Sequence, residues 1–203
     1  MKPLNGIKVI DLTHMLAGPY AGMVIADLGA EVVKVEPLVH GEMTRGLLKS
    51  DPDYSFKEFG AYFLTLNRNK KSVSLDLKSD EGLKVFYDLV KSADVVLNNF
   101  SAGVVKKLKV DFDSLKKINP RIITCSITGF GETGPHSARP AYDQIVQAYS
   151  GAMSITGPDA NTPTRAGIPI GDLGSGLYSV IGILAALLSR EQTNKGQHID
   201  MSL

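Results

Sequence analysis

Asp172 is the side chain whose surroundings best suit chemistry. It lies between Gly171 and Gly174, directly before a stretch with helical apolar spacing. One interpretation is a helix N-cap, in which the carboxylate accepts hydrogen bonds from the free N–H groups of the first turn. Those N–H groups and the helix dipole also favour an ionised carboxylate, and the glycines leave room for a large substrate. Asp172 is therefore also a candidate nucleophile or general base.

A second candidate site is the polar turn at 67–72, which reads Asn-Arg-Asn-Lys-Lys-Ser before a strand-like run. The charges of Lys and the fork donors of Arg would suit a phosphate or nucleotide, and an ordinary solvated turn is the alternative. His14 follows the first strand-like run, where ligands meet open α/β sheets, or else makes only local hydrogen bonds.

Metal and thiol chemistry find little support in the sequence. His40, His136 and His198 lack the spacing of metal ligands, and the single cysteine excludes an internal disulfide and a thiolate-rich metal site. Cys125 lies in an apolar run and is predicted to be a small core residue rather than a reactive thiol. No metal site is expected, and the cysteine usage fits a reducing compartment.

The elements that must position these residues alternate between strands and helices. Apolar, β-branched runs predict strands at 7–12, 32–35, 72–77, 95–97 and 122–127, and a strand-like run ends the chain at 199–203. Helical spacing and capping residues predict helices at 19–28, 79–90, 103–108, 112–118, 142–149 and 173–191. Residues 7–36 spell strand, helix, strand, for which a parallel, right-handed crossover is expected. The whole pattern predicts an α/β fold with a doubly wound parallel sheet.

Two regions depart from this alternation. Residues 38–70 have no regular period and are expected to form an excursion from the sheet, of a size that is usually functional. The final helix has the clearest periodicity of the chain. Its predicted apolar stripe consists of Leu173, Leu177, Val180, Ile181, Leu184, Leu187 and Leu188.

Composition excludes several classes of protein. The chain has 203 residues, 43% of them hydrophobic and 21% charged, which argues against a disordered or fibrous protein. The net charge of +1 gives no bulk field toward nucleic acid or an anionic membrane. The longest strongly apolar stretch, 180–188, is far shorter than the ~20 residues that cross a bilayer. We therefore expect a soluble, cytoplasmic protein with no nucleic-acid or membrane partner.

Taken in order, short motifs along nearly the whole chain resemble the class III CoA-transferases, a family that includes formyl-CoA transferase, carnitine CoA-transferase and the α-methylacyl-CoA racemases. The motifs are Leu-Asn-Gly-Ile-Lys-Val at 4–9, Ala-Gly-Pro at 17–19, Leu-Gly-Ala-Glu-Val-Val-Lys-Val-Glu at 28–36, Gly-Glu-Met-Thr-Arg at 41–45, the polar turn at 67–72, Gly-Phe-Gly at 129–131, Ala-Tyr-Asp at 141–143 and Gly-Asp at 171–172. The resemblance implies a Rossmann-like large-domain fold.

The resemblance also implies roles for individual residues. Asp172 matches the aspartate that attacks the acyl-CoA thioester and carries a covalent intermediate, and Tyr142 and Asp143 match other active-site positions. The implied CoA-binding residues are His14, Met15, Asn67, Arg68, Asn69, Lys70, Lys71 and Arg139. The implied substrates are an acyl-CoA and a small carboxylic acid, with CoA as substrate and no permanently bound cofactor.

Departures from the family motifs keep alternatives open. Ala141-Tyr142-Asp143 stands where racemases have Gly-His-Asp, so an acyl-CoA racemase or epimerase is the second hypothesis. Leu16 replaces a glutamine and Pro37 a CoA-contacting arginine of formyl-CoA transferase, so oxalate and formyl-CoA need not be substrates. A non-catalytic CoA-binding half that needs a second chain is the third hypothesis.

The resemblance bears on domain organisation as well. Members of the family continue into a small domain and a returning C-terminal segment, neither of which is expected in residues 1–203. We therefore expect an N-terminal CoA-binding segment of the large domain, as a truncation or as half of a split enzyme. Family members form interlinked homodimers, so a homodimer or a second half-chain is the expected partner.

Overall fold

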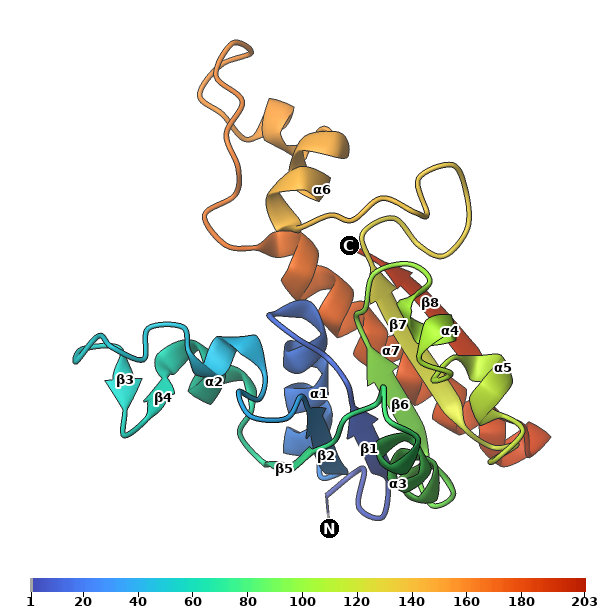
Figure 1. Cartoon of the computed structure of the whole chain (residues 1–203). Coiled ribbons are helices and arrows are strands. Elements are labelled where there is room, and N and C mark those ends of the chain that lie inside the picture. The colour runs from blue at the N-terminus through green and yellow to red at the C-terminus, as the bar shows by residue number, and fades with distance from the viewer. Residues whose placement is uncertain (1) are drawn as a thin grey trace.

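A six-stranded sheet forms the centre of the computed structural model, which describes residues 2–203 (Figure 1). Its strands are β1 (Lys8–Asp11), β2 (Glu31–Glu36), β5 (Lys70–Ser74), β6 (Val95–Asn98), β7 (Ile123–Thr128) and β8 (His198–Ser202). Their spatial order is β5-β2-β1-β6-β7-β8, and every neighbouring pair is parallel. The predicted parallel α/β sheet is confirmed, and its strand order reverses between β1 and β6.

Helices cover both faces of this sheet, as a doubly wound fold requires. Helices α1 (Ala17–Asp27) and α7 (Ile170–Thr193) pack on one face, and α3 (Asp80–Val90), α4 (Val104–Lys107) and α5 (Phe112–Leu115) pack on the other. Predicted local signals account for several boundaries. The Ser79 hydroxyl caps α3 by accepting from the Gly82 N–H at 3.0 Å. Gly29 takes a positive φ of 108° after α1, a conformation that favours glycine.

The connection from β7 to β8 has the opposite hand to the connection from β1 to β2. Helices α1 and α7 lie on the same face, but they lead toward opposite edges of the sheet. Such crossovers are almost always right-handed, and short connections impose that rule most strictly. Residues 129–169 separate β7 from α7 and extend away from the sheet at the top of Figure 1, with α6 (Asp143–Tyr149) and the 3-10 helix η2 (Ala152–Ile155) inside them. The long detour removes the constraint.

The side of α7 that is buried differs from the predicted stripe. Val180 and Leu187 face the core, but Leu177, Ile181 and Leu188 are 45%, 58% and 68% exposed. The buried side instead carries Ser175, Gly176, Ser179, Ile183, Ala186 and Arg190. A Cβ on Gly176 would lie 2.8 Å from the Ala17 carbonyl oxygen, so only small residues let α7 approach α1. The buried side of α7 is the side whose small residues allow close packing on α1, not the side with the most apolar residues. The predicted stripe was therefore wrong for Leu177, Ile181 and Leu188.

Helix α7 also meets a length and composition test for membrane spans. It has 24 residues, and a window of it reaches a mean hydropathy of 1.6. The sequence stretch 180–188 therefore understated the apolar length of this helix. In the fold, α7 packs against β7, β8 and α1, which is the place of a crossover helix in an α/β core.

The excursion at 38–70 contains more structure than its sequence predicted. It holds a 3-10 turn η1 (Met43–Arg45), a short hairpin of β3 (Ser55–Phe56) and β4 (Phe59–Gly60), and helix α2 (Ala61–Leu66). Strand β5 then begins at Lys70, two residues before the predicted start, so part of the polar turn is strand. Helix α2 packs on η1 and α1, close to the carboxylate described next.

Candidate active site

Asp172 occupies the third position of α7 and does not cap that helix. The residue before the helix, Pro169, offers no side-chain cap, and the carboxylate of Asp143 takes its place. Asp143 Oδ1 accepts from the Gly171 N–H at 2.8 Å and from the Asp172 N–H at 3.4 Å. The N-cap interpretation of Asp172 is therefore wrong, because α7 already begins at Ile170 and Asp172 lies inside its first turn. Among residues 2–203 nothing donates a hydrogen bond to the Asp172 carboxylate.

The surroundings of Asp172 make its carboxylate unusually basic. Burial, and then the negative charge of Asp143, raise the pKa of Asp172 from 3.8 to about 6. The pKa of Tyr62 on α2 is raised by burial, by the charge of Asp172 and by that of Glu42. Tyr62 thus lies within the field of Asp172, although no pattern in the irregular excursion indicated it. A half-buried carboxylate with a raised pKa and a phenol nearby is typical of a catalytic site.

We expect the ionisation of Asp172 to govern the pH dependence of any reaction in which it is the nucleophile. Only the carboxylate attacks, so the rate of Asp172 acylation should rise as pH increases through about 6 and level off above it. Carboxyl ¹³C chemical shifts, assigned by the signal lost in Asp172→Asn, would measure this pKa directly. A titration midpoint near the usual aspartate value of about 4 would contradict the expectation.

Asp143 and Tyr142 lie where α6 begins. Asp143 is buried, and its second oxygen, Oδ2, accepts from Gln147 Nε2 at 2.6 Å. Tyr142 stands just before α6 and is 70% exposed. The structure thus brings Asp143 to the backbone of Asp172 and leaves Tyr142 open to solvent.

A crevice opens where the strand order reverses. The chains leaving β1 and β6 are tied together there, because the His14 N–H donates to Asn99 Oδ1 at 2.8 Å and Asn99 Nδ2 donates to the His14 carbonyl at 2.7 Å. The Met15 N–H donates to Glu42 Oε1 at 3.0 Å. Burial, and then the charge of Lys34, lower the pKa of His14, which favours the neutral ring. His14 and Met15 therefore belong to a well-anchored loop.

The crevice encloses a cavity of about 290 Å³. Its lining is mostly apolar, with one lysine, and comes from the carboxyl ends of four strands. The lining residues are Leu12, His14, Val35, Glu36, Pro37, Leu38, Leu75, Asp76, Leu77, Lys78, Phe100 and Leu108. In open α/β sheets, ligands bind at such a reversal of strand order. Sequence reasoning found His14 and missed Phe100 and 75–78, which the strand order could have revealed because they follow β6 and β5.

The polar turn at 67–71 lies elsewhere. It precedes β5 and therefore sits at the amino edge of the parallel sheet, whereas His14 follows β1 at the carboxyl edge. Its side chains also have internal partners. Lys70 Nζ donates to Asp11, to Asn67 and to the Pro19 carbonyl, Arg68 and Asn69 bind Asp27, and Lys71 pairs with Glu31. The structure does not bring this turn together with the crevice or with Asp172.

Arg139 also stands apart from the crevice. Its guanidinium lies over the rings of Phe130 and Tyr149, with 5.6 Å to each ring centroid. These aromatic rings surround His136 as well, so the loop after β7 forms its own polar and aromatic cluster. The structure thus separates Arg139 from His14 and Met15, with which the family resemblance grouped it.

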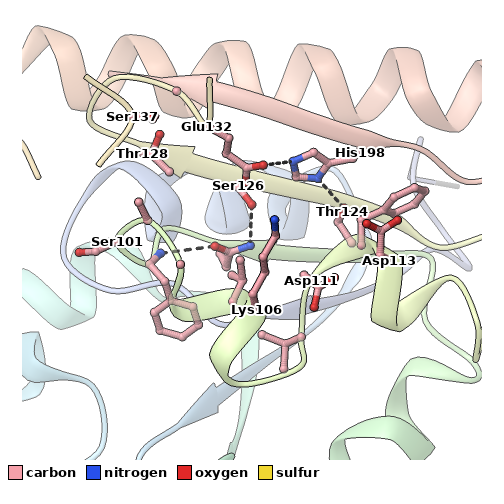
Figure 2. Close-up of a pocket in the computed structure, with 18 of the residues that line it drawn as sticks. Ser101, Lys106, Asp111, Asp113, Thr124, Ser126, Thr128, Glu132, Ser137 and His198 are labelled. Carbon is pink, nitrogen blue, oxygen red and sulfur yellow. Dashed lines mark hydrogen bonds and ion pairs between the residues drawn. The ribbon is translucent and has the colours of Figure 1, made fainter. Parts of the chain in front are cut away.

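A further cavity, of about 350 Å³, lies on the sheet face opposite α7 (Figure 2). The unusual hand of the β7–β8 connection puts its crossover helix, α7, on the other face, so the cavity lies between α4, α5 and the strands β7 and β8. Strand β7 presents Thr124, Ser126 and Thr128 to it. His198 bonds to Thr124 Oγ1 at 2.7 Å and to Glu132 Oε2 at 3.0 Å, as the dashed lines of Figure 2 mark. Asn98 Nδ2 donates to Ser126 Oγ at 3.0 Å, but the buried Thr128 Oγ1 has no hydrogen-bond partner among residues 2–203.

Neither a metal cluster nor a reactive thiol occurs in the part of the chain that the structure describes. In residues 2–203, no group of three or more His, Cys, Asp or Glu side chains could hold a metal ion. Cys125 is buried in β7, and burial raises the pKa of its thiol to about 12. The thiol is therefore protonated near neutral pH, in agreement with a core role.

Fold and site together define an α/β protein with a nucleophile-like carboxylate at a helix start and a ligand crevice at the reversal of strand order. The chain belongs to CoA-transferase family III, whose sequence pattern matches residues 4–203. It is 45% identical to a succinate–glutarate CoA-transferase of Agrobacterium fabrum and 44% identical to a formyl-CoA:oxalate CoA-transferase of Streptomyces coelicolor. These alignments cover 99% and 100% of this chain, but 51% and 48% of those proteins.

A solved structure agrees with this assignment. A CAIB/BAIF family protein from Brucella suis has a TM-score of 0.93 and 45% sequence identity, over 99% of this chain and 53% of that one. The chain thus spans about half the length of the relatives that it matches.

Proposed function

We propose that this chain carries the CoA-binding and nucleophilic part of an enzyme that transfers coenzyme A between an acyl-CoA and a small carboxylic acid. The observation that carries the proposal is the half-buried Asp172 carboxylate at the start of α7, with a pKa raised to about 6. Membership of CoA-transferase family III supports the reaction class. Relatives named for succinate and glutarate, and for oxalate, share 45% and 44% sequence identity with this chain. Sequence identity therefore favours no particular acid as the substrate.

In the proposed reaction Asp172 is acylated first. One carboxylate oxygen attacks the thioester carbonyl and the C–S bond breaks. The CoA thiolate departs, and the product on Asp172 is an acyl-aspartyl anhydride. The thiolate then attacks the aspartyl carbonyl and expels the donor acid as its carboxylate, which leaves an aspartyl-CoA thioester. The acceptor carboxylate repeats these two exchanges in reverse, so Asp172 is regenerated without any redox change.

Nearby donors suit the charge that develops in these steps. Each tetrahedral intermediate places a negative charge on a carbonyl oxygen, which needs preorganised hydrogen-bond donors. The exposed Tyr142 hydroxyl is one candidate donor, and the Tyr62 phenol, which lies in the field of Asp172, is another. Open space above Gly174, where an added Cβ would meet nothing within 4 Å, leaves room for the thioester.

The crevice at the strand-order reversal suits the nucleotide end of CoA. Its apolar walls and the Phe100 ring would hold adenine, and Lys78 would meet a phosphate. Pro37 lines this crevice, at the position where the resemblance expects an arginine, so Lys78 is the cation of the lining. The turn at 67–71 has internal partners, and we assign it a structural role.

Loss of the aromatic wall should weaken CoA binding. Because stacking of a base on an aromatic ring contributes about 1–3 kcal/mol, we expect Phe100→Ala to raise the Kd for CoA by roughly 10-fold. Isothermal titration calorimetry with CoA measures this, with Phe56→Ala, a change at a phenylalanine that is 64% exposed, as the control. Equal affinities for the two variants would place adenine elsewhere.

Trapping the covalent intermediate tests the proposal itself. Incubation with succinyl-CoA, followed by hydroxylamine or borohydride and peptide mass spectrometry, should reveal an adduct on Asp172. A protein that binds CoA but forms no adduct at Asp172 with succinyl-, formyl- or acetyl-CoA would refute it. The cytoplasmic location expected from composition stays a prediction, and so does the homodimer expected from the resemblance.

A further inference from the structure

Gln147 is a buried amide that sits behind the nucleophile without touching it. It lies one helical turn after Asp143 in α6 and is 3% exposed. Its Nε2 donates to Asp143 Oδ2 at 2.6 Å, and its Oε1 accepts from the Ala166 N–H at 2.8 Å. Both ends of the carboxamide are therefore engaged, one by the acid that caps α7 and one by the segment that leads into α7.

The position of Asp143 depends on this amide. A carboxylate on the first residue of a helix has several rotamers, and a buried charge needs its remaining lone pairs satisfied. Gln147 occupies Oδ2, which leaves Oδ1 aimed at the Gly171 and Asp172 N–H groups. The chain of contacts thus runs from Ala166 through Gln147 and Asp143 to the backbone of Asp172.

Packing leaves this chain of contacts little freedom. A Cβ on Gly171 would lie 2.8 Å from Val146 Cγ2 and 3.1 Å from Asp143 Oδ1, so α6 and the start of α7 are in close contact. A shift of Asp143 would therefore move the first turn of α7. A displacement of about 1 Å at a reacting group costs up to about 100-fold in rate.

We propose, on the basis of the proposed function, that Gln147 is a positioning residue for the nucleophile: it holds the Asp143 carboxylate against the first turn of α7 and ties both to Ala166. No group of Gln147 meets substrate in this arrangement. Its contribution is to the geometry and the electrostatic surroundings of Asp172, and so to the acylation step rather than to CoA affinity. In support, the charge that Gln147 fixes in place is the second cause of the raised pKa of Asp172.

Three variants test this role. Gln147→Leu removes both hydrogen bonds, and Gln147→Glu keeps the shape but sets a second carboxylate against Asp143. The double variant Asp143→Asn/Gln147→Glu exchanges the two groups: the amide is now at 143 and the carboxylate at 147. The hydrogen bond between the two side chains is restored, and the negative charge moves by one helical turn. The new amide can donate to the new carboxylate and still accept from the Gly171 N–H. Gln144→Leu, on the exposed side of the same helix, is the matched control.

The first readout is single-turnover acylation of Asp172 by succinyl-CoA, together with the Kd for CoA. We expect both single Gln147 variants to slow acylation by about 10-fold to 100-fold with the Kd for CoA unchanged, and the double variant to recover most of the rate. If wild-type protein forms the adduct and Gln147→Leu forms it as fast as Gln144→Leu, the inference is wrong. A double variant no faster than the single variants would also contradict it.

The second readout does not require catalysis. Amide hydrogen exchange should become faster at Gly171 and Ala166 in Gln147→Leu and remain unchanged in Gln144→Leu. Unchanged exchange at both amides would overturn the inference whatever the activity. If wild-type protein forms no adduct at all, the proposed function fails, and the exchange result still decides whether Gln147 holds this turn.

Discussion

Replacing Asp172 by Asn should abolish covalent catalysis and make the protein more stable at neutral pH. The amide cannot attack a thioester, so no adduct should form, and any CoA transfer should fall by at least about 10³-fold. The Kd for CoA should change little, because the crevice proposed to hold the nucleotide lies at the carboxyl ends of the strands and contains no residue of α7. Mass spectrometry after incubation with succinyl-CoA measures the adduct.

The gain in stability follows from the raised pKa of Asp172. Between its ordinary value of 3.8 and about 6, the folded protein binds more protons at this group than the unfolded chain does. The free energy of unfolding therefore falls as pH rises through that window, and the loss is complete above it. An amide carries no charge to desolvate, so Asp172→Asn should raise the melting temperature at pH 7.5 and not at pH 4.

The control for this prediction is Asp53→Asn, which makes the same change of charge at an exposed position. Thermal unfolding of both variants, followed by circular dichroism at pH 4 and at pH 7.5, separates a local effect from a change in net charge. Equal shifts for both variants would show that the surroundings of Asp172 do not destabilise its charged form. An adduct in Asp172→Asn would exclude this residue as the nucleophile.

The second large effect is expected at Lys70. Its ammonium pairs with Asp11 at 2.8 Å, with side-chain exposures of only 2% and 0%. Burial by itself would raise the pKa of Asp11, but Lys34 and Lys70 hold it well below the usual range. Lys70→Met leaves this buried carboxylate short of a partner, and breaking such a pair costs about 3–5 kcal/mol of stability.

The neighbouring residue supplies a matched control. Lys71 pairs with Glu31 on the surface, with side-chain exposures of 71% and 44%, and such pairs contribute at most about 1 kcal/mol. Urea unfolding should therefore show a much larger loss for Lys70→Met than for Lys71→Met. Equal losses would mean that the Asp11–Lys70 pair does not stabilise the sheet. Changing both partners, as in Asp11→Leu/Lys70→Met, should recover part of the loss.

The comparison of these two lysines shows where sequence reasoning reached its limit. Both belong to the polar turn that was predicted to bind CoA, and their residue type and position in the chain are nearly the same. One is buried under α1 and the other is exposed on the edge strand. Successive side chains of a strand point to opposite faces of the sheet, so Lys70 and Lys71 of β5 point in opposite directions. The sequence did not show this, because the strand was predicted to begin at 72 and the structure begins it at Lys70.

Asp172 illustrates the same limit at the candidate active site. Flanking glycines and helical spacing placed it correctly at the start of a helix, and the alternative between cap and nucleophile stayed open. The structure excludes the cap, because α7 begins at Ile170 and the Asp143 carboxylate accepts from the N–H groups of its first turn. No local pattern could reveal a contact between residues 29 positions apart. The effect of the Asp172 charge on the pKa of Tyr62 could not be predicted for the same reason, since these two residues are also far apart in the sequence.

By itself the amino-acid sequence determined the α/β class, the order of most elements and the helix start that carries Asp172. Periodicity and capping are local, acting over about one to seven residues, and so they can be read directly from the chain. Tertiary structure decided which side of α7 is buried, which lysine is paired in the core, and why the Asp172 carboxylate holds its proton to about pH 6. Burial and charge depend on what distant segments bring together, and only the packed sheet brings these segments together.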